Sequence, residues 1–172
     1  MKRLNKAGFT LIELLAVITI MGILMMVAIP SVSRTIENSR RDTFADNALT
    51  YVSTVRNAVM ADEISCGSTT ASATANGTYH FVINTEDQQT KDIMEKVALS
   101  SWGSAKITGY VSWTKATNTT TGRTTTEYKV CLTDAGNHGF RTLVSEKEVS
   151  RAKIYTDGAT CPTAPGTACT LK

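Results

Sequence analysis

The most distinctive chemical group of this chain is Glu13, a carboxylate placed one turn into an apolar stretch. Residues 9–29 read FTLIELLAVITIMGILMMVAI and contain no other charged side chain. A carboxylate inside a membrane is costly unless it is paired, so Glu13 calls for a cationic partner. Cleavage after Gly8 would supply one, because it frees the α-amine of Phe9 at the same depth. Gly8 is a small residue at which a peptidase could cut, and Glu13 would then pair with the new amine of its own or a neighbouring chain. The alternative is a Glu13 that reaches back to headgroups and water.

The rest of the chain offers little catalytic chemistry. The phosphate-binding pattern G-x-x-x-x-G-K-[ST], the nucleophile pattern G-x-S-x-G and the zinc pattern H-E-x-x-H are all missing from the sequence. His80 alternates with apolar residues and is expected to be a surface histidine. Residues 134–139, DAGNHG, have too few oxygen ligands for calcium, which favours a plain turn. We predict no catalytic residue, no metal site and no cofactor, and we expect a protein that is not an enzyme.

The apolar stretch is long enough to cross a membrane. At about 1.5 Å of rise per residue, the helix of residues 9–29 matches a hydrocarbon core of about 30 Å. The basic leader, residues 1–8, is expected to stay in the cytoplasm, which places residues 30–172 on the other side. An ordinary secretory signal is less favoured, since residues 28–33 offer only two suitable small residues, Ser31 and Ser33.

Four cysteines lie on the predicted exported side: Cys66, Cys131, Cys161 and Cys169. An even count in an exported domain favours disulfides, and four cysteines allow three connectivities. Cys161 and Cys169 bracket a turn-rich loop that they can close, which leaves Cys66 to pair with Cys131. We favour this pairing. A zinc site is less favoured because the sequence has no C-x-x-C spacing.

The N-terminal residues resemble a known signal. Residues 6–14, KAGFTLIEL, are closely similar to the prepilin signal of the type IV pilin and pseudopilin superfamily. Its pattern is a basic leader, a glycine, a phenylalanine that becomes the N-terminus, a glutamate as fifth mature residue and an apolar helix interrupted by proline. Here these residues are Gly8, Phe9, Glu13 and Pro30. The resemblance is specific over about the first 35 residues and only architectural beyond them.

The resemblance implies a processing and assembly pathway. A prepilin peptidase would cut after Gly8 and methylate the amine of Phe9, and Glu13 would then act in assembly. Copies of the chain would leave the membrane through a membrane platform driven by a cytoplasmic ATPase and pack their helices into a filament. The family often ties a sheet strand to the C-terminal segment, which would instead pair Cys131 with Cys161 or Cys169.

The charge of the mature chain gives no indication of nucleic-acid binding. The 172 residues include 18 basic and 15 acidic side chains. Three of the basic side chains belong to the leader: Lys2, Arg3 and Lys6. The mature side chains therefore sum to zero, and a bulk electrostatic attraction to phosphates is excluded.

Pro30 lies inside a pattern that continues as helix, so we predict a kink or a locally melted turn there. Beyond it, residues 30–66 are expected to form an amphipathic continuation that ends near residues 65–67, with Gly67 as a left-handed cap. Its apolar stripe comprises Val32, Ile36, Phe44, Ala48, Val52, Val55 and Val59.

Residues 67–172 are expected to form a globular head with an antiparallel sheet of about four or five strands. Strands are predicted over residues 79–83, 106–114, 126–133, 140–144 and 152–156. A capping box at residues 85–88 predicts a short helix whose apolar face carries Ile93, Met94, Val97, Ala98 and Trp102. The Thr-rich residues 115–126 are expected to be an exposed hairpin tip. The fold class is thus α+β, a long N-terminal helix packed against a C-terminal sheet.

Three functions are compatible with these features. We favour a structural subunit of an extracellular type IV pilus used in adhesion, motility or surface contact, made as a single-pass precursor in the cytoplasmic membrane. The alternative is a pseudopilin or minor pilin of a type II secretion or DNA-uptake system. A membrane-anchored enzyme or receptor domain is the least favoured.

Overall fold

The computed structural model describes residues 9–67, 71–72, 76–94, 100–103 and 106–172. The chain divides into two compact units, Met1–Ser39 and Arg40–Lys172. The leader predicted for residues 1–8 lies outside the described residues. The first unit contains the start of the long helix, and the second contains the end of that helix and the whole sheet, so each unit is described by itself.

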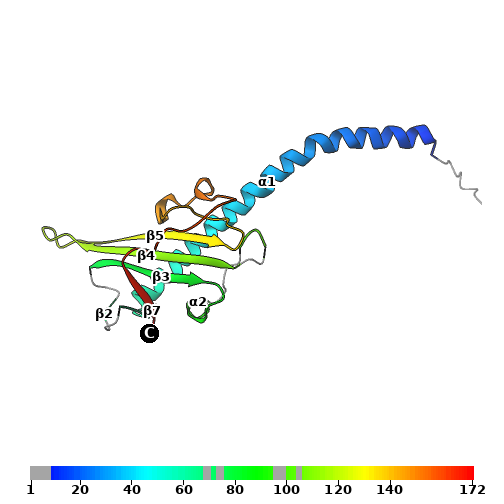
Figure 1. The fold of residues 1–172 in the computed structure, drawn as a ribbon. Helices are drawn as coiled ribbons and strands as arrows, with labels where there is room; N and C mark the ends of the chain where they lie inside the picture. Colours follow the sequence, from blue (N-terminus) through cyan, green and yellow to red (C-terminus); the bar gives the residue numbers. More distant parts are fainter. Residues whose placement is uncertain (1–8, 68–70, 73–75, 95–99, 104–105) are drawn as a thin grey trace, which may run out of the picture. The chain divides into compact units, whose positions relative to one another are not determined.

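Helix α1 spans Leu11–Met60 and begins with the apolar stretch predicted from the sequence (Figure 1). In the first unit, every large apolar side chain of residues 9–29 is exposed. α1 is the one helix of the described chain that is long and apolar enough to cross a membrane. Helix continues through Pro30, so the locally melted turn expected there is not found. Pro30 still lacks the N–H that would bond the carbonyl of Met26, and a kink remains a prediction.

α1 ends earlier than the sequence predicted, at Met60 rather than near residues 65–67. Asp62 takes the left-handed conformation with φ of 58°. Its N–H bonds the carbonyl of Val59, and the N–H of Glu63 bonds the carbonyl of Ala58. This is a Schellman cap, in which aspartate occupies a position usually held by glycine. Residues 64–66 are therefore free to form a strand.

The head contains a seven-stranded sheet rather than the expected four or five strands (Figure 1). The strand order is β2-β1-β7-β3-β4-β5-β6. All neighbouring pairs are antiparallel except β3 and β7, which run parallel. The strands are β1 (Ile64–Cys66), β2 (Ala71–Ser72), β3 (Gly77–Asn84), β4 (Ile107–Thr117), β5 (Thr124–Asp134), β6 (Val144–Ser145) and β7 (Thr167–Leu171).

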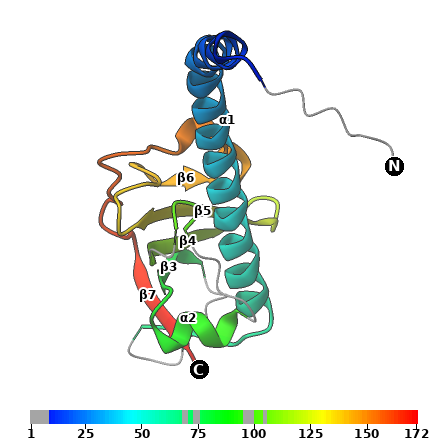
Figure 2. The same cartoon turned by 90° about the vertical axis from the view of Figure 1, so that its right-hand side faces the viewer.

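The second half of α1 lies along one face of the sheet and forms the core of the head (Figure 2). The apolar stripe predicted for the helix is buried from Phe44 onward. Alternating apolar residues of three of the predicted strands are also buried: Tyr79, Phe81 and Ile83; Ile107, Val111 and Trp113; Tyr128, Val130 and Leu132. The α+β fold class is confirmed, and it is pilin-like in architecture.

Helix α2 (Gln88–Ile93) is shorter than predicted and is not opened by a capping box. Its N-cap residue is Asp87, which makes no side-chain cap bond. The Oγ1 of Thr85 instead accepts a hydrogen bond from the N–H of Ile107 at the start of β4. The apolar residues predicted for the helix face lie partly beyond its end, and two of them, Val97 and Ala98, lie outside the described residues.

Two of the predicted strands are mostly replaced by other structure. In place of a strand over residues 140–144, only Val144–Ser145 forms β6. In place of a strand over residues 152–156, the 3₁₀ helix η2 (Arg151–Lys153) follows η1 (Glu146–Glu148). Tyr155 makes a single bridge to Gly139. The 3₁₀ turns provide local hydrogen bonds for backbone N–H and C=O groups that a neighbouring strand would otherwise have to bond.

The favoured disulfide pairing was wrong. Cys66 bonds Cys169 and Cys131 bonds Cys161. β7 lies between β1 and β3, which places Cys169 directly opposite Cys66, with Cα atoms 4.1 Å apart. Cys161 and Cys169 are close in sequence, but the strand pairing gives Cys169 another partner. The loop between them is therefore not closed by a disulfide. The Cys131–Cys161 pair is one of those that the prepilin resemblance implied.

Removing the Cys66–Cys169 disulfide is expected to cost more stability than removing the other one. The Cys66–Cys169 bond joins residues 103 apart and Cys131–Cys161 joins residues 30 apart. In the chain-entropy model, these bonds contribute about 4.7 and about 3.6 kcal/mol to the free energy of unfolding. Denaturant unfolding of the full chain in detergent, comparing C66S/C169S with C131S/C161S, measures the difference. Mass mapping that recovers a Cys66–Cys131 peptide from the unmodified chain contradicts this arrangement.

Candidate functional site

The carboxylate of Glu13 is held by the first turn of α1. Its Oε2 accepts hydrogen bonds from the backbone N–H and the Oγ1 of Thr10, at 2.9 and 2.7 Å. In return, the backbone N–H of Glu13 bonds the Oγ1 of Thr10 at 3.4 Å. This reciprocal pair is a capping box, which satisfies donors that the start of a helix leaves without partners.

Sequence reasoning gave Glu13 a partner in the cleaved N-terminus and overlooked Thr10. The signal was present, because Thr-x-x-Glu directly before an apolar run is the capping-box pattern. The box also places a negative charge in the first turn, where the helix dipole favours it. An uncleaved chain thus has a local partner for the acid of its apolar helix.

The predicted cleavage site adjoins this turn. Phe9 precedes α1 and its side chain is 89% exposed, while Gly8 lies outside the described residues. The cleavage, the methylation of Phe9 and the assembly role of Glu13 stay predictions. In the structure, Phe9 lies next to the capping box, so a new amine at Phe9 would form within a few residues of the Glu13 carboxylate.

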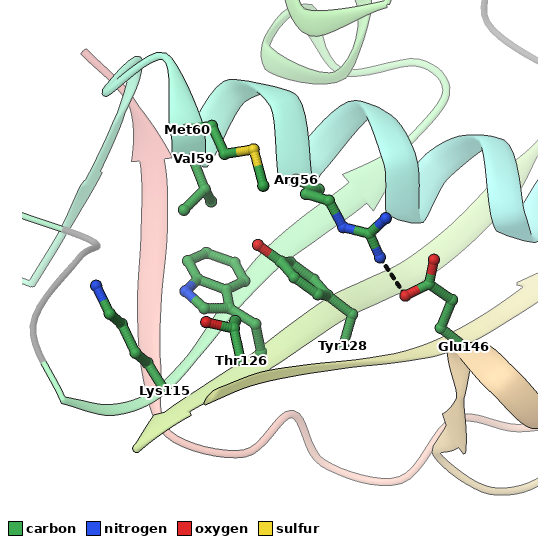
Figure 3. Close-up of a pocket in the computed structure, with 8 residues that line it drawn as sticks. Arg56, Val59, Met60, Lys115, Thr126, Tyr128 and Glu146 are labelled. Carbon is green, nitrogen blue, oxygen red and sulfur yellow. Dashed lines mark hydrogen bonds and ion pairs between the residues drawn. The ribbon is translucent and has the colours of Figure 1, made fainter. Parts of the chain in front are cut away.

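The head has a cavity of about 460 Å³ between the end of α1 and strands β4 and β5 (Figure 3). Its wall combines aromatic, apolar and charged side chains: Arg56, Val59, Met60, Trp113, Lys115, Thr126, Tyr128 and Glu146. Trp113 and Tyr128 are buried and stack with ring centroids 6.5 Å apart, while Met60 is 74% exposed. The cavity is thus an opening at the edge of the core.

The charged groups of this cavity are engaged with one another. Arg56 pairs with Glu146, and its guanidinium lies 4.7 Å from the ring centroid of Tyr128 (Figure 3). Burial raises the pKa of Tyr128 above its ordinary value, and the nearby Arg56 only partly opposes this effect. Tyr128 is therefore a neutral phenol at physiological pH. These contacts join η1 to α1 across the sheet, so their evident role is to stabilise the head.

The loop considered as a calcium candidate is a turn organised by Asp134. The Oδ1 of Asp134 accepts the N–H groups of Gly136 and His138, at 2.8 and 2.9 Å. Both carboxylate oxygens lie 2.9 Å from Nδ1 of His138, and Oδ2 accepts the Oγ of Ser100. The imidazole of His138 stacks on Trp102, with centroids 4.5 Å apart. Because the carboxylate of Asp134 accepts hydrogen bonds from within the loop and from Ser100, the loop is held as a turn.

This cluster contains Ser, His and Asp but lacks the order of a catalytic triad. In a triad the serine hydroxyl bonds the imidazole, whereas Ser100 donates to the carboxylate of Asp134. The other candidate histidine, His80, is half-buried and bonds the carbonyl of Pro165 through Nδ1 at 2.9 Å. Among the described residues, no three His, Cys, Asp or Glu side chains gather in a way that could hold a metal ion.

Comparison with known proteins identifies the N-terminal segment. Residues 3–29 match the family model described as the prokaryotic N-terminal methylation motif. Residues 3–29 are a type IV prepilin signal. The curated proteins and the solved structures that were compared with the chain include no match. Together with the pilin-like fold, the prepilin signal makes this a pilin-like or pseudopilin-like protein.

The prepilin signal has direct consequences for the partners of the chain. It implies processing by a peptidase and assembly into a filament. It also agrees with a membrane-anchored precursor, since the motif overlaps the apolar first part of α1. The structure of the motif adds that its acid, Glu13, and Thr10 form one capping unit.

Replacing Asp134 with asparagine is expected to destabilise the head in a pH-dependent way. Burial by itself raises the pKa of Asp134, but hydrogen bonds from Ser100 and His138 outweigh it and hold the pKa below its ordinary value of 3.8. The ionised form therefore contributes stability that is full above the unfolded-state pKa and is lost as pH falls through the lower folded-state pKa. D134N should cost about 1–3 kcal/mol at pH 7, since buried donors lose their charged acceptor.

Urea unfolding of the full chain in detergent at pH 7 and near pH 3 measures this effect. The difference between D134N and the unmodified chain should shrink at the lower pH. D157N is the matched control, because Asp157 is an exposed carboxylate whose ion pair with Arg141 lies at the surface. A D134N deficit that is the same at both pH values contradicts a role for the ionised carboxylate.

Proposed function

We propose that this protein is a structural subunit of an extracellular type IV pilus. A prepilin peptidase removes residues 1–8, cutting between Gly8 and Phe9, and methylates the amine of Phe9. The mature chain resides in the cytoplasmic membrane and then polymerises through residues 9–29, while the later part of α1 belongs to the head. A membrane platform and a cytoplasmic ATPase drive the assembly, and the filament serves adhesion, motility or surface contact.

The observation that carries this proposal is the prepilin signal on a helix whose first part is apolar and exposed. Residues 9–36 of α1 contain no buried side chain. Between Glu13 and Arg34 the sequence has no charged residue. Such a surface is stable in lipid, and it is equally stable against the same surface of other copies. Transfer from the membrane to a filament core exchanges one apolar environment for the other.

Glu13 can couple cleavage to assembly. In the precursor, the nitrogen of Phe9 is an amide and carries no charge, so the carboxylate is satisfied by Thr10 alone. Cleavage turns that nitrogen into an amine, and one methyl group leaves it cationic. A carboxylate in an apolar environment then gains an opposite charge, in its own or a neighbouring chain. Only a processed subunit presents both charges, which favours the entry of processed subunits into the filament.

The head provides the exposed part of the proposed filament. Its surface is polar around the hairpin of β4 and β5, whose tip carries Thr119, Thr120 and Thr121, all exposed. The two disulfides join β1 to β7 and β5 to the segment before β7. A head cross-linked in this way suits a surface that works outside the cell.

Replacing Glu13 tests the proposal. E13Q keeps an amide oxygen that can accept from Thr10 but removes the charge, so we expect normal cleavage and at least about a tenfold loss of filaments sheared from the cell surface. Breaking a buried ion pair typically costs about 3–5 kcal/mol, which supports a loss of this size. Immunoblots of the sheared and membrane fractions, with N-terminal peptides identified by mass spectrometry, measure both effects.

The matched control is T10A, which removes both hydrogen bonds made by the Thr10 hydroxyl, one to the Glu13 carboxylate and one from the Glu13 N–H, and keeps the charge of Glu13. T10A should retain most of its filaments. Unchanged filament yield in E13Q refutes the assembly role of the charge. Normal cleavage with filaments that stay short and within the envelope would instead assign the chain to a pseudopilin or minor pilin.

A further inference from the structure

The hairpin of β4 and β5 has a strand edge with no neighbour in the described structure. β5 runs from Thr124 to Asp134 (Figure 1). On its outer side it pairs with β6 only through Lys129 and Val130. Residues 124–128 are paired with β4 on the other side. Their outer side is therefore a sheet edge of five residues among the described parts of the chain.

The direction of the free backbone groups follows from the hairpin. The N–H of Asn118 bonds the carbonyl of Arg123, which makes these two residues a hydrogen-bonded pair across the turn. In an antiparallel ladder such pairs alternate with non-hydrogen-bonded pairs. The N–H and C=O groups of Thr124 and Thr126 thus point outward. The outward bonds further along β5 agree with this alternation, since the carbonyl of Leu132 accepts the N–H of Phe140 and the N–H of Asp134 bonds the carbonyl of His138.

There is space beside this edge for another strand. A groove of about 510 Å³ runs along it, lined by residues 123–128 and closed at its far end by Ser145, Glu146 and Lys147. Natural sheets commonly protect an exposed edge with proline, a bulge or a covering loop. Residues 123–128, RTTTEY, contain no proline and three consecutive β-branched threonines. These residues favour strand pairing.

We propose that this edge binds the same edge of a second copy of the chain, in an antiparallel pair centred on Thr125. In this register Thr124 of each copy lies opposite Thr126 of the other. Both residues point their backbone groups outward, so four hydrogen bonds form across the two-fold axis. The two sheets join into one continuous sheet.

The charge pattern of the edge selects this register. Pairing about Thr125 sets Arg123 of each copy opposite Glu127 of the other, which makes two cross-strand ion pairs. Opposite charges and threonine pairs at directly opposed positions each stabilise a sheet, whereas like charges destabilise it. Pairing about Thr126 would instead set Arg123 opposite Lys129. The contact of Glu127 with Lys129 in the same strand is long, at 3.7 Å, and leaves the carboxylate 57% exposed to a second partner.

Five residues on each side make a weak contact between two single heads, because it lies far below the area of a stable dimer. The contact becomes effective where many copies are held side by side, since each further contact is then intramolecular. A membrane or a bundle of filaments provides such an array. The pairing itself depends only on the head and is independent of the proposed role in a pilus.

A cysteine at the two-fold axis tests the register. The Cα atoms of Thr125 in the two copies should lie about 4.5 Å apart as a non-hydrogen-bonded pair. Full-length T125C in membranes, treated with a mild oxidant, should give a disulfide-linked dimer through that position. In T124C, the matched control, the two Cα atoms lie about 8 Å apart, which is too far for a disulfide. T125C should exceed T124C by about tenfold or more in linked peptide.

Exchanging the charges of Arg123 and Glu127 provides a second test, in which the four native cysteines and the introduced T125C are kept. R123E and E127R each place two like-charge pairs in the contact, so each single variant should lower dimer yield in the T125C background about tenfold. The double variant R123E/E127R restores two opposite pairs and should restore the yield. Equal cross-linking of T125C and T124C, or no rescue by the double variant in a chain that retains its native disulfide map, overturns the proposal.

Discussion

The structure depends on the apolar first part of α1, whose exposure to water is energetically unfavourable. Fifteen large apolar side chains between Phe9 and Ile29 are exposed. Burying each such side chain is worth about 1.5–3 kcal/mol, so together they represent a driving force on the order of tens of kcal/mol. This force requires lipid or other copies around the helix. In the proposed function, the prepilin signal, the capping box at its start and the separately folded head belong to a chain that moves between these two environments.

The head forms a core of its own because the end of α1 has a different composition. From Phe44 onward, the helix has one apolar face, and this face packs on the sheet. The sheet is completed by β7, which comes from the end of the chain and pairs with β1 next to the end of α1. Lys172 adds an ion pair to Asp62 at 2.5 Å. The helix end and the chain terminus thus stabilise each other.

The sequence predicted those features that depend on local pattern. The apolar stretch, the helix face from Phe44 and the alternating faces of β3, β4 and β5 follow from the periodicity of apolar residues. The placement of β7 depends on contacts about a hundred residues apart, which no local pattern reveals. That placement decided the Cys66–Cys169 bond, so the loop-based pairing was wrong.

The end of α1, which is capped by Asp62, was missed because the left-handed conformation is usually taken by glycine. For the N-terminal site, the residue types indicated Glu13, whose role in assembly stays a prediction, but its hydrogen-bond partner Thr10 was overlooked.

Mass spectrometry of protein sheared from the cell surface tests whether this chain is processed and assembled as proposed. We expect an abundant chain that begins at Phe9 and carries one methyl group on its α-amine, a mass increase of about 14 Da. Such a chain would have both the cation and the carboxylate that assembly needs. An intact leader, or an N-terminus beyond Pro30, contradicts the account, because the apolar helix would then be either unprocessed or lost.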